Sequence, residues 1–363
     1  MNLELTDEQV ALRDTTRRFL AEKAPISPHV RGLLDDSTGT TDTVWRGLAN
    51  LGVIGLLVPE EHGGAGMTMV EAGVVAEELG AALNPGPWPS SAVAAARLLL
   101  RLNVPAAELM TGIADGTTVV TVCLPEAGHP GLTAGRHGAD AVVRGALGGV
   151  PDAAAADVLL VVAEEREGAG LFAVRAGSPG LSVQPNRGID PSRKRCRVAF
   201  DSAPALRLAS AAPDLVAAVA DDVLIAAAAD ALGAARAVME LAVEYAKTRK
   251  QFGQPIGSFQ AIQHLCVDMY ETVELARGGV IHALWAADHA EPGERQVAAL
   301  RLKGFAGRLA SVGDTAIQVL GGIGYTWEHD AHLYLKRLLG WSAFRGASDR
   351  YLTDLGVRLA KGT

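Results

Sequence analysis

Residues 236–253 read RAVMELAVEYAKTRKQFG, a helical pattern that runs into a polar, glycine-terminated turn. The apolar positions recur at helical spacing and share a face that we expect to pack: Val238, Leu241, Ala242 and Tyr245. The charged positions share another face, which we expect to be solvated: Arg236, Glu240, Glu244 and Lys247. The pattern therefore predicts one long amphipathic helix over residues 214–249.

Three further helical patterns follow this helix, over residues 258–289, 294–320 and 331–361. Short breakers join the segments at Gly253–Gly257 and Pro292–Gly293. Because long helices with such short connections pack antiparallel against one another, the C-terminal region is predicted to be a four-helix bundle.

The N-terminal and central regions follow different patterns. Residues 1 to about 115 have helical apolar spacing, and Thr6 with Gln9 predicts a capping box at the first helix. Four β-branched runs then alternate with glycine, proline and aspartate and predict strands: Thr117–Cys123, Asp157–Val162, Leu171–Val174 and Arg197–Phe200. The predicted fold class is α+β, mainly α, with an N-terminal helical domain (1–115), a small central β-barrel or sandwich domain (116–207) and the bundle (208–363).

The composition is that of an ordinary folded protein, with 49% hydrophobic and 20% charged residues. A net charge of -8 without a concentrated basic patch argues against nucleic acid or an anionic membrane surface as a partner. Three separated cysteines without a Cys-x-x-Cys pair predict neither a disulfide framework nor a zinc site. The acidic start lacks the pattern of an export signal, and charges interrupt the apolar stretch 215–246, so we expect a cytoplasmic protein.

The turn after the long helix carries side chains that suit a dinucleotide. Arg249 supplies a planar cationic fork, Gln251 an amide, Phe252 an aromatic face and Gly253 an open backbone. The same residues are also typical of an ordinary helix end, where basic side chains meet the helix dipole and a glycine ends the last turn. Their spacing leaves both interpretations open.

A second segment, Gln318-Val-Leu-Gly-Gly-Ile-Gly324, ends another predicted helix with three glycines in four residues. Without side chains there, a ligand or a second subunit can approach the backbone closely. The segment is not a Rossmann fingerprint, because no strand precedes it and the G-x-G-x-x-G spacing is absent, nor is it a Walker loop.

These two segments together resemble the acyl-CoA dehydrogenases, and so do three others: Leu51–Gly64, Glu77–Gly80 and Ser258–Gln263. The resemblance covers nearly the whole chain and is weakest in the β region. It implies FAD-dependent α,β-desaturation of an acyl-CoA thioester, with electrons passing to an acceptor flavoprotein. It also implies a cofactor-binding set that reaches a flavin held mainly by a neighbouring subunit: Arg249, Phe252, Gln260, Gln318, Gly321 and Gly322.

The catalytic base of the family is not found where it is expected. The family pattern Tyr-Glu-Gly-Thr-Ser-Glu aligns with Phe344-Arg-Gly-Ala-Ser-Asp349, so Arg345 occupies the usual glutamate position and cannot accept a proton. Some members carry the base on the helix before the Arg-x-x-Phe-Gly motif, where this chain has Val223 beside Asp222. We favour a solvated acid over a catalytic one for Asp222, which leaves the catalytic residue unknown.

Two segments that line the flavin in this family also depart from its pattern. They read Val122-Cys-Leu-Pro-Glu-Ala127 and Gly149-Val-Pro-Asp152. With the missing base, these losses resemble one subunit of the heteromeric acyl-CoA dehydrogenases of actinobacterial steroid breakdown. We therefore expect a base-lacking subunit of a heterotetramer with a homologous partner, acting in lipid and steroid catabolism.

The alternatives are a scaffold pseudoenzyme that binds no flavin, and a flavin oxidase or monooxygenase of the same fold. Two smaller segments favour structural roles. Glu328–His332 is more typical of a helix start than of a metal site, and we predict no metal. The basic run Asp190–Arg197 is more typical of a solvated turn than of a nucleotide site.

Overall fold

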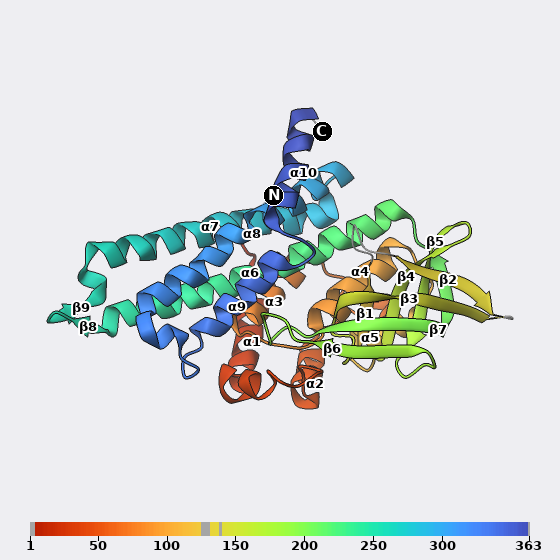
Figure 1. Ribbon diagram of the computed structural model, residues 1–363, viewed down its shortest axis with the longest axis horizontal. Coiled ribbons are helices and arrows are strands. Elements are labelled where there is room, and N and C mark those ends of the chain that lie inside the picture. The colour runs from red at the N-terminus through yellow and green to blue at the C-terminus, as the bar shows by residue number, and fades with distance from the viewer. Residues whose placement is uncertain (1–3, 125–130, 138–139, 362–363) are drawn as a thin grey trace. The chain divides into compact units, whose positions relative to one another are not determined.

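The computed structural model describes residues 4–124, 131–137 and 140–361 (Figure 1). The structure is mainly helical, and along the sequence one larger sheet lies between two helical regions. This confirms the predicted α+β class. Its contacts group the chain into two units that are interleaved in sequence. One unit contains Met1–Val30, Gly73–Asn84 and Leu224–Thr363, and the other contains Arg31–Ala72 and Pro85–Val223. The division into domains at 115 and 207 stays a prediction.

Five α-helices precede the sheet among the described residues: α1 Asp7–Lys23, α2 Asp42–Asn50, α3 Met69–Ala81, α4 Ala96–Arg101 and α5 Ala107–Ala114. The predicted capping box at α1 is confirmed. The Thr6 hydroxyl accepts a hydrogen bond from the Gln9 amide at 3.3 Å, and the Gln9 side chain accepts one from the Thr6 amide at 3.0 Å. These bonds satisfy two backbone donors that a helix start otherwise leaves unpaired.

The central sheet has seven strands within the described residues: β1 Val120–Cys123, β2 Leu132–His137, β3 Asp140–Pro151, β4 Val158–Glu165, β5 Gly168–Arg175, β6 Leu181–Asn186 and β7 Arg195–Ser210. The strand path β4-β2-β3-β7-β5 returns to β4, because β4 pairs with both β2 and β5. The sheet therefore closes like a barrel around a core that includes Leu159, Phe172 and Val198. The four predicted runs overlap β1, β4, β5 and β7, whereas β2, β3 and β6 were missed.

Five longer helices form the C-terminal region: α6 Pro213–Thr248, α7 Gln260–His289, α8 Pro292–Leu320, α9 Ala331–Ala343 and α10 Ser348–Lys361. The first three agree with prediction within a few residues. The prediction of one helix over 331–361 was wrong, because the chain turns between α9 and α10. There Arg345 and Gly346 adopt φ values of +54° and +112°, which a continuing helix does not allow.

Contacts from α8 and α10 stabilise this break. The Lys303 ammonium, fully buried on α8, donates to the Trp341 and Ser342 carbonyls at 2.7 and 2.8 Å, and so caps the end of α9. The Tyr351 hydroxyl donates to the Arg345 carbonyl at 2.7 Å. Because Lys303 comes from α8, the pattern of residues 331–361 alone could not predict this part of the turn.

Helices α3 and α6 cross where two glycines face each other's backbone. A Cβ on Gly80 would lie 1.9 Å from the Asp230 carbonyl oxygen, and a Cβ on Gly233 would lie 1.8 Å from the Glu77 carbonyl oxygen. Any side chain at either position would force the helices apart. The glycine of the Glu77–Gly80 segment is therefore explained by close helix packing.

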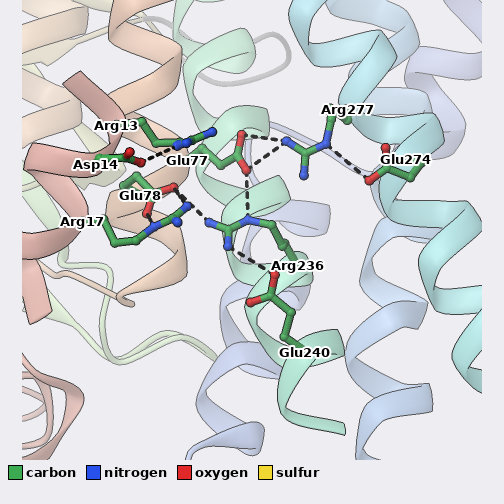
Figure 2. Close-up of polar contacts among 9 residues, drawn as sticks. All are labelled: Arg13, Asp14, Arg17, Glu77, Glu78, Arg236, Glu240, Glu274 and Arg277. Atoms are coloured by element: carbon green, nitrogen blue, oxygen red, sulfur yellow. Dashed lines mark hydrogen bonds and ion pairs between the residues drawn. The ribbon is translucent and has the colours of Figure 1, made fainter. Parts of the chain in front are cut away.

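Charged side chains next to this crossing link four helices (Figure 2). Glu78 on α3 accepts from Arg17 on α1 at 2.8 Å and from Arg236 on α6 at 3.0 Å. Glu77 accepts from Arg236 at 3.1 Å and from Arg277 on α7 at 3.2 Å. The prediction that Arg236 is solvated was wrong, since 15% of its side chain is exposed, because α3 covers that part of α6.

Candidate functional site

The two glycine-ended helices end at the same end of the bundle. Helix α6 runs to a hairpin formed by β8 (Lys250–Gln251) and β9 (Gln254–Pro255), and α7 runs back from it (Figure 1). Helix α8 packs on α7 and returns toward the hairpin end. Because α7 and α8 are each about 45 Å long, at about 1.5 Å per residue, the end of α8 comes level with the start of α7.

The hairpin presents an aromatic ring to solvent. Phe252 and Gly253 form its turn with φ values of +51° and +82°, a conformation in which glycine is favoured. The Arg249 carbonyl accepts from the Ile256 amide at 2.8 Å and closes the hairpin. The Phe252 side chain is 91% exposed, and its ring meets that of Phe259 edge to face at 6.0 Å. The turn thus holds Phe252 outward, against only one other ring.

The end of α8 leaves its backbone open. Gly321 has a φ of +65°, and a Cβ built on Gly321 or Gly322 would meet no atom within 4 Å. Gln318, one turn earlier, is exposed. A phosphate group could therefore reach backbone amides here without meeting a side chain.

The short helical segment after α8 exposes further apolar side chains that were not predicted as site residues. Ile323, Tyr325 and Trp327 are 42%, 73% and 63% exposed. The Lys336 ammonium lies 4.5 Å from the centre of the Trp327 ring. Aromatic residues directly after a glycine-rich helix end were the available signal, because such side chains are usually buried.

All six predicted cofactor-binding residues are exposed at this end of the bundle, with Gln260 at the first position of α7. An exposed guanidinium, two amide side chains and an open glycine backbone are the groups that bind a diphosphate. The residues present therefore fit the pyrophosphate of FAD. Their assignment as a flavin-binding set stays a prediction.

Arg345 lies away from this set. Its loop follows α9 and is held by Lys303, which is 17 residues before the end of α8 at Leu320. At about 1.5 Å per residue, this separates the loop from the glycine end of α8 by about 25 Å. Arg345 and the predicted flavin-contacting residues thus lie at separate places along the bundle.

Asp222 is fully buried, so the expectation of a solvated acid was wrong. Its carboxylate accepts from Arg97 Nε at 2.8 Å, and from Arg101 Nε and Nη2 at 2.6 and 2.8 Å. Both arginines lie in α4, more than one hundred residues earlier in the sequence. A buried carboxylate that is hydrogen-bonded to two guanidinium groups suits a structural ion pair.

The second departing flavin-lining segment ends strand β3. Asp152 has a φ of +53° and is buried, and Ser90 donates to its carboxylate at 2.5 Å. The Pro151 carbonyl accepts from the Thr121 hydroxyl at 2.6 Å. The segment is therefore fixed by groups of its own chain. In the first segment, residues 125–127 lie outside the described part.

The basic run Asp190–Arg197 is not the solvated turn that was expected. Its Lys194 side chain is buried, and the ammonium donates to the carbonyls of Leu33, Leu34 and Pro191 at 2.6, 2.9 and 2.9 Å. Burial lowers the pKa of Lys194 from its ordinary value. Three carbonyl acceptors compensate for the lost hydration of this cation.

Two other kinds of site are absent from the described residues. In residues 4–124, 131–137 and 140–361, no group of three or more histidine, cysteine, aspartate or glutamate side chains is arranged to hold a metal ion. The same residues contain no helix with the length and apolar character needed to cross a membrane. At Glu328–His332, α9 begins at Ala331 with Asp330 as its N-cap residue, as the helix-start interpretation predicted.

Solved structures resemble this fold over its whole length. The structure of a variant of the Tcur3481-Tcur3483 steroid ACAD superposes with a TM-score of 0.89 at 30% identity, covering 98% of each chain. The ChsE4-ChsE5 complex from Mycobacterium tuberculosis gives a TM-score of 0.90 at 25% identity, covering 99% of each chain. The names of both structures give two components.

Sequence comparison identifies the family. Residues 6–102 match the acyl-CoA dehydrogenase N-terminal domain, and residues 225–360 match the C-terminal domain. The acyl-CoA dehydrogenase IpdE2 of Mycobacterium tuberculosis is 33% identical over 92% of each chain. FadE34 of the same organism is 37% identical over 99% of this chain, which spans half the length of that relative. With both family domains and a relative of matching length, the chain belongs to the acyl-CoA dehydrogenase family of oxidoreductases.

Proposed function

We propose that this chain is one subunit of a heteromeric, FAD-dependent acyl-CoA dehydrogenase and that it completes the flavin site of a homologous partner subunit. The partner would supply the catalytic base, and the assembly would desaturate an acyl-CoA thioester and pass electrons to an acceptor flavoprotein. When bound, FAD would accept the hydride that leaves the β-carbon of the substrate. This chain would contribute the binding groups at the hairpin end of its bundle.

One observation carries the proposal: the predicted flavin-contacting residues are exposed at the hairpin end, about 25 Å along α8 from the loop of Arg345. This placement suits residues that reach the diphosphate of a flavin held mainly by another subunit, and an arginine at the predicted position of the base leaves that base to be supplied by the partner. The resemblance to the ChsE4-ChsE5 complex and the Tcur3481-Tcur3483 steroid ACAD supports a heteromer and a steroid-type acyl group.

The test is the flavin content of the chain co-expressed with its homologous partner. Arg249→Ala should lower the visible flavin absorbance per complex several-fold, because the diphosphate loses a charge-assisted hydrogen-bond donor. Lys247→Ala is the matched control. Its side chain is 61% exposed at the same helix end and pairs with Glu244, so its loss should leave the flavin content unchanged.

Three outcomes would contradict the proposal. Unchanged flavin in the Arg249→Ala complex would leave only a scaffolding role for this chain. A yellow assembly of this chain alone that oxidises acyl-CoA would show that it has its own base. Turnover with molecular oxygen and a substrate that is not a thioester would instead favour the oxidase or monooxygenase alternative.

A further inference from the structure

The last helix of the bundle, α10, has an apolar surface that the described residues of the chain leave uncovered. None of its 14 residues is buried. Figure 1 shows α10 running away from the other helices of the bundle toward the C-terminus. An isolated helix of this length is marginal in water, so contacts along its side must stabilise it.

Its contact with α8 uses only one side of the helix. A Cβ on Gly304 would lie 2.8 Å from the Leu352 side chain, and a Cβ on Gly307 would lie 3.7 Å from the Ser348 hydroxyl. Near the other end of α10, the Arg358 guanidinium donates to the Gln296 side chain. Leu352 nevertheless stays 50% exposed, so α8 covers it only in part.

Leu352, Gly356 and Leu359 form a stripe beside this contact, which we call the α10 stripe. Leu359 is 61% exposed, and a Cβ on Gly356 would meet no atom within 4 Å. The two leucines are seven residues apart, two helical turns or about 10 Å, and lie on nearly the same side of the helix. A glycine between them lets another helix approach the backbone closely.

The spacing of the α10 stripe fits a second copy of the same helix. Leu352 and Leu359 are equally far from a midpoint between Leu355 and Gly356. A two-fold axis at that midpoint lays Leu352 of one copy on Leu359 of the other, and the reverse contact follows by symmetry. Gly356 then lies at the crossing, where the two backbones come closest.

The charges of α10 favour the same antiparallel arrangement. Before the midpoint lie Asp349, Arg350 and Asp354, with a sum of -1, and after it lie Arg358 and Lys361, with a sum of +2. Antiparallel pairing places the acidic half on the basic half, whereas parallel pairing places like charges together. It also sets each positive helix N-terminus beside the partner's negative C-terminus.

We propose that the α10 stripe is a contact between two copies of this chain, in which their α10 helices pair antiparallel about Gly356. The opposite charges of the two halves of α10 make a second copy of this helix a complementary partner. One helix pair is smaller than the interface of a stable dimer, so it would join two copies already brought close in a larger assembly.

Cysteine crosslinking tests this contact and traps it even when it is weak. Gly356→Cys, in a Cys266→Ser background, should form a disulfide-linked dimer of this chain on mild oxidation, because disulfides require Cα atoms within about 7 Å. Val357→Cys is the matched control. Val357 is also exposed, at 48%, but it is turned about 160° around the helix from Leu359, so it should give little dimer. Adding Leu359→Glu to Gly356→Cys should reduce the dimer several-fold.

Equal crosslinking of the two cysteine variants, or none from Gly356→Cys, would overturn the proposal. The complex with the homologous partner provides a second readout, in which a photoreactive benzophenone is attached to the cysteine at position 356. A product that contains two copies of this chain supports the contact. A product with the partner subunit shows that α10 docks on a different chain, and the proposal fails. Neither readout depends on flavin.

Discussion

Asp230 and Arg337 form a buried ion pair, with Arg337 Nη1 2.9 and 3.0 Å from the two carboxylate oxygens of Asp230. Only 8% and 2% of these side chains are exposed. The second guanidinium nitrogen of Arg337 donates to the Leu83 carbonyl at 3.1 Å. The pair thereby joins α6, α9 and the chain that follows α3, next to the glycine crossing at Gly80.

Removing one member of this pair should destabilise the protein more than removing both. Arg337→Met leaves the Asp230 carboxylate buried without its cation, which should cost about 3–5 kcal/mol of unfolding free energy. The double variant Asp230→Leu, Arg337→Met should recover much of this loss, because two apolar side chains leave no buried charge. Urea unfolding of both variants measures the difference, and equal losses would contradict the prediction.

Within the charge network of Figure 2, substitution of Glu78 should destabilise the protein, and substitution of Glu240 should have little effect on its stability. The Glu78 side chain is 2% exposed and accepts from Arg17 and Arg236, so Glu78→Gln should cost about 3 kcal/mol. Glu240 pairs with the same Arg236 but is 56% exposed, and Glu240→Gln should cost less than about 0.5 kcal/mol. Thermal or urea unfolding checks both values. A large loss of unfolding free energy in Glu240→Gln would contradict this and show that the exposed ion pair of Glu240 with Arg236 is important for stability.

Asp222→Asn should affect stability rather than the chemical step. Two guanidinium groups would lose the buried carboxylate that neutralises them, and we expect a loss of about 3–5 kcal/mol. Asp214→Asn, at an exposed position in the first turn of the same helix, should cost less than about 1 kcal/mol. If Asp222→Asn keeps the stability of the natural chain but abolishes turnover of the assembled complex, the prediction is wrong and Asp222 would be the missing base.

The buried thiol of Cys123 predicts a loss of stability in alkaline solution. Burial raises the pKa of Cys123 from 9.0 to about 12. Between these two pH values the folded chain keeps the thiol proton and the unfolded chain has lost it. The thiol's contribution to the free energy of unfolding is therefore complete below pH 9 and disappears as pH rises from 9 to about 12. The difference in unfolding free energy between the natural chain and Cys123→Ala should change across this window by up to about 1.4 kcal/mol per pH unit.

Comparison with Cys123→Ala removes the effects of other groups that titrate in the same range. The pKa of Lys194 is lowered by burial, which makes stability rise with pH below 10.5, opposite to the cysteine effect. Both chains carry Lys194, so its contribution cancels. Parallel pH dependence of the two chains would show that the thiol does not contribute.

Sequence patterns predicted the elements that are specified by residues close together along the chain. Thr6 and Gln9 cap α1 through bonds three residues apart, and α6, α7 and α8 follow apolar spacing within each helix. Strand β3 was missed for the opposite reason. Its 12 residues include Gly145, Gly148 and Gly149, which have low strand propensity, and pairing with β2 and β7 makes it a strand.

The sequence by itself determined the family, through motifs whose residues lie close together along the chain, and it predicts that Arg345 stands at the position of the family's glutamate. Only the tertiary structure decided the surroundings of these residues. Asp222 is buried because Arg97 and Arg101 reach it from 125 and 121 residues away, and α9 ends before Arg345 because Lys303 caps it at Trp341, 38 residues later in the chain. The electrostatic free energy of a carboxylate and the end of a helix depend on distant partners, which one-dimensional spacing does not specify.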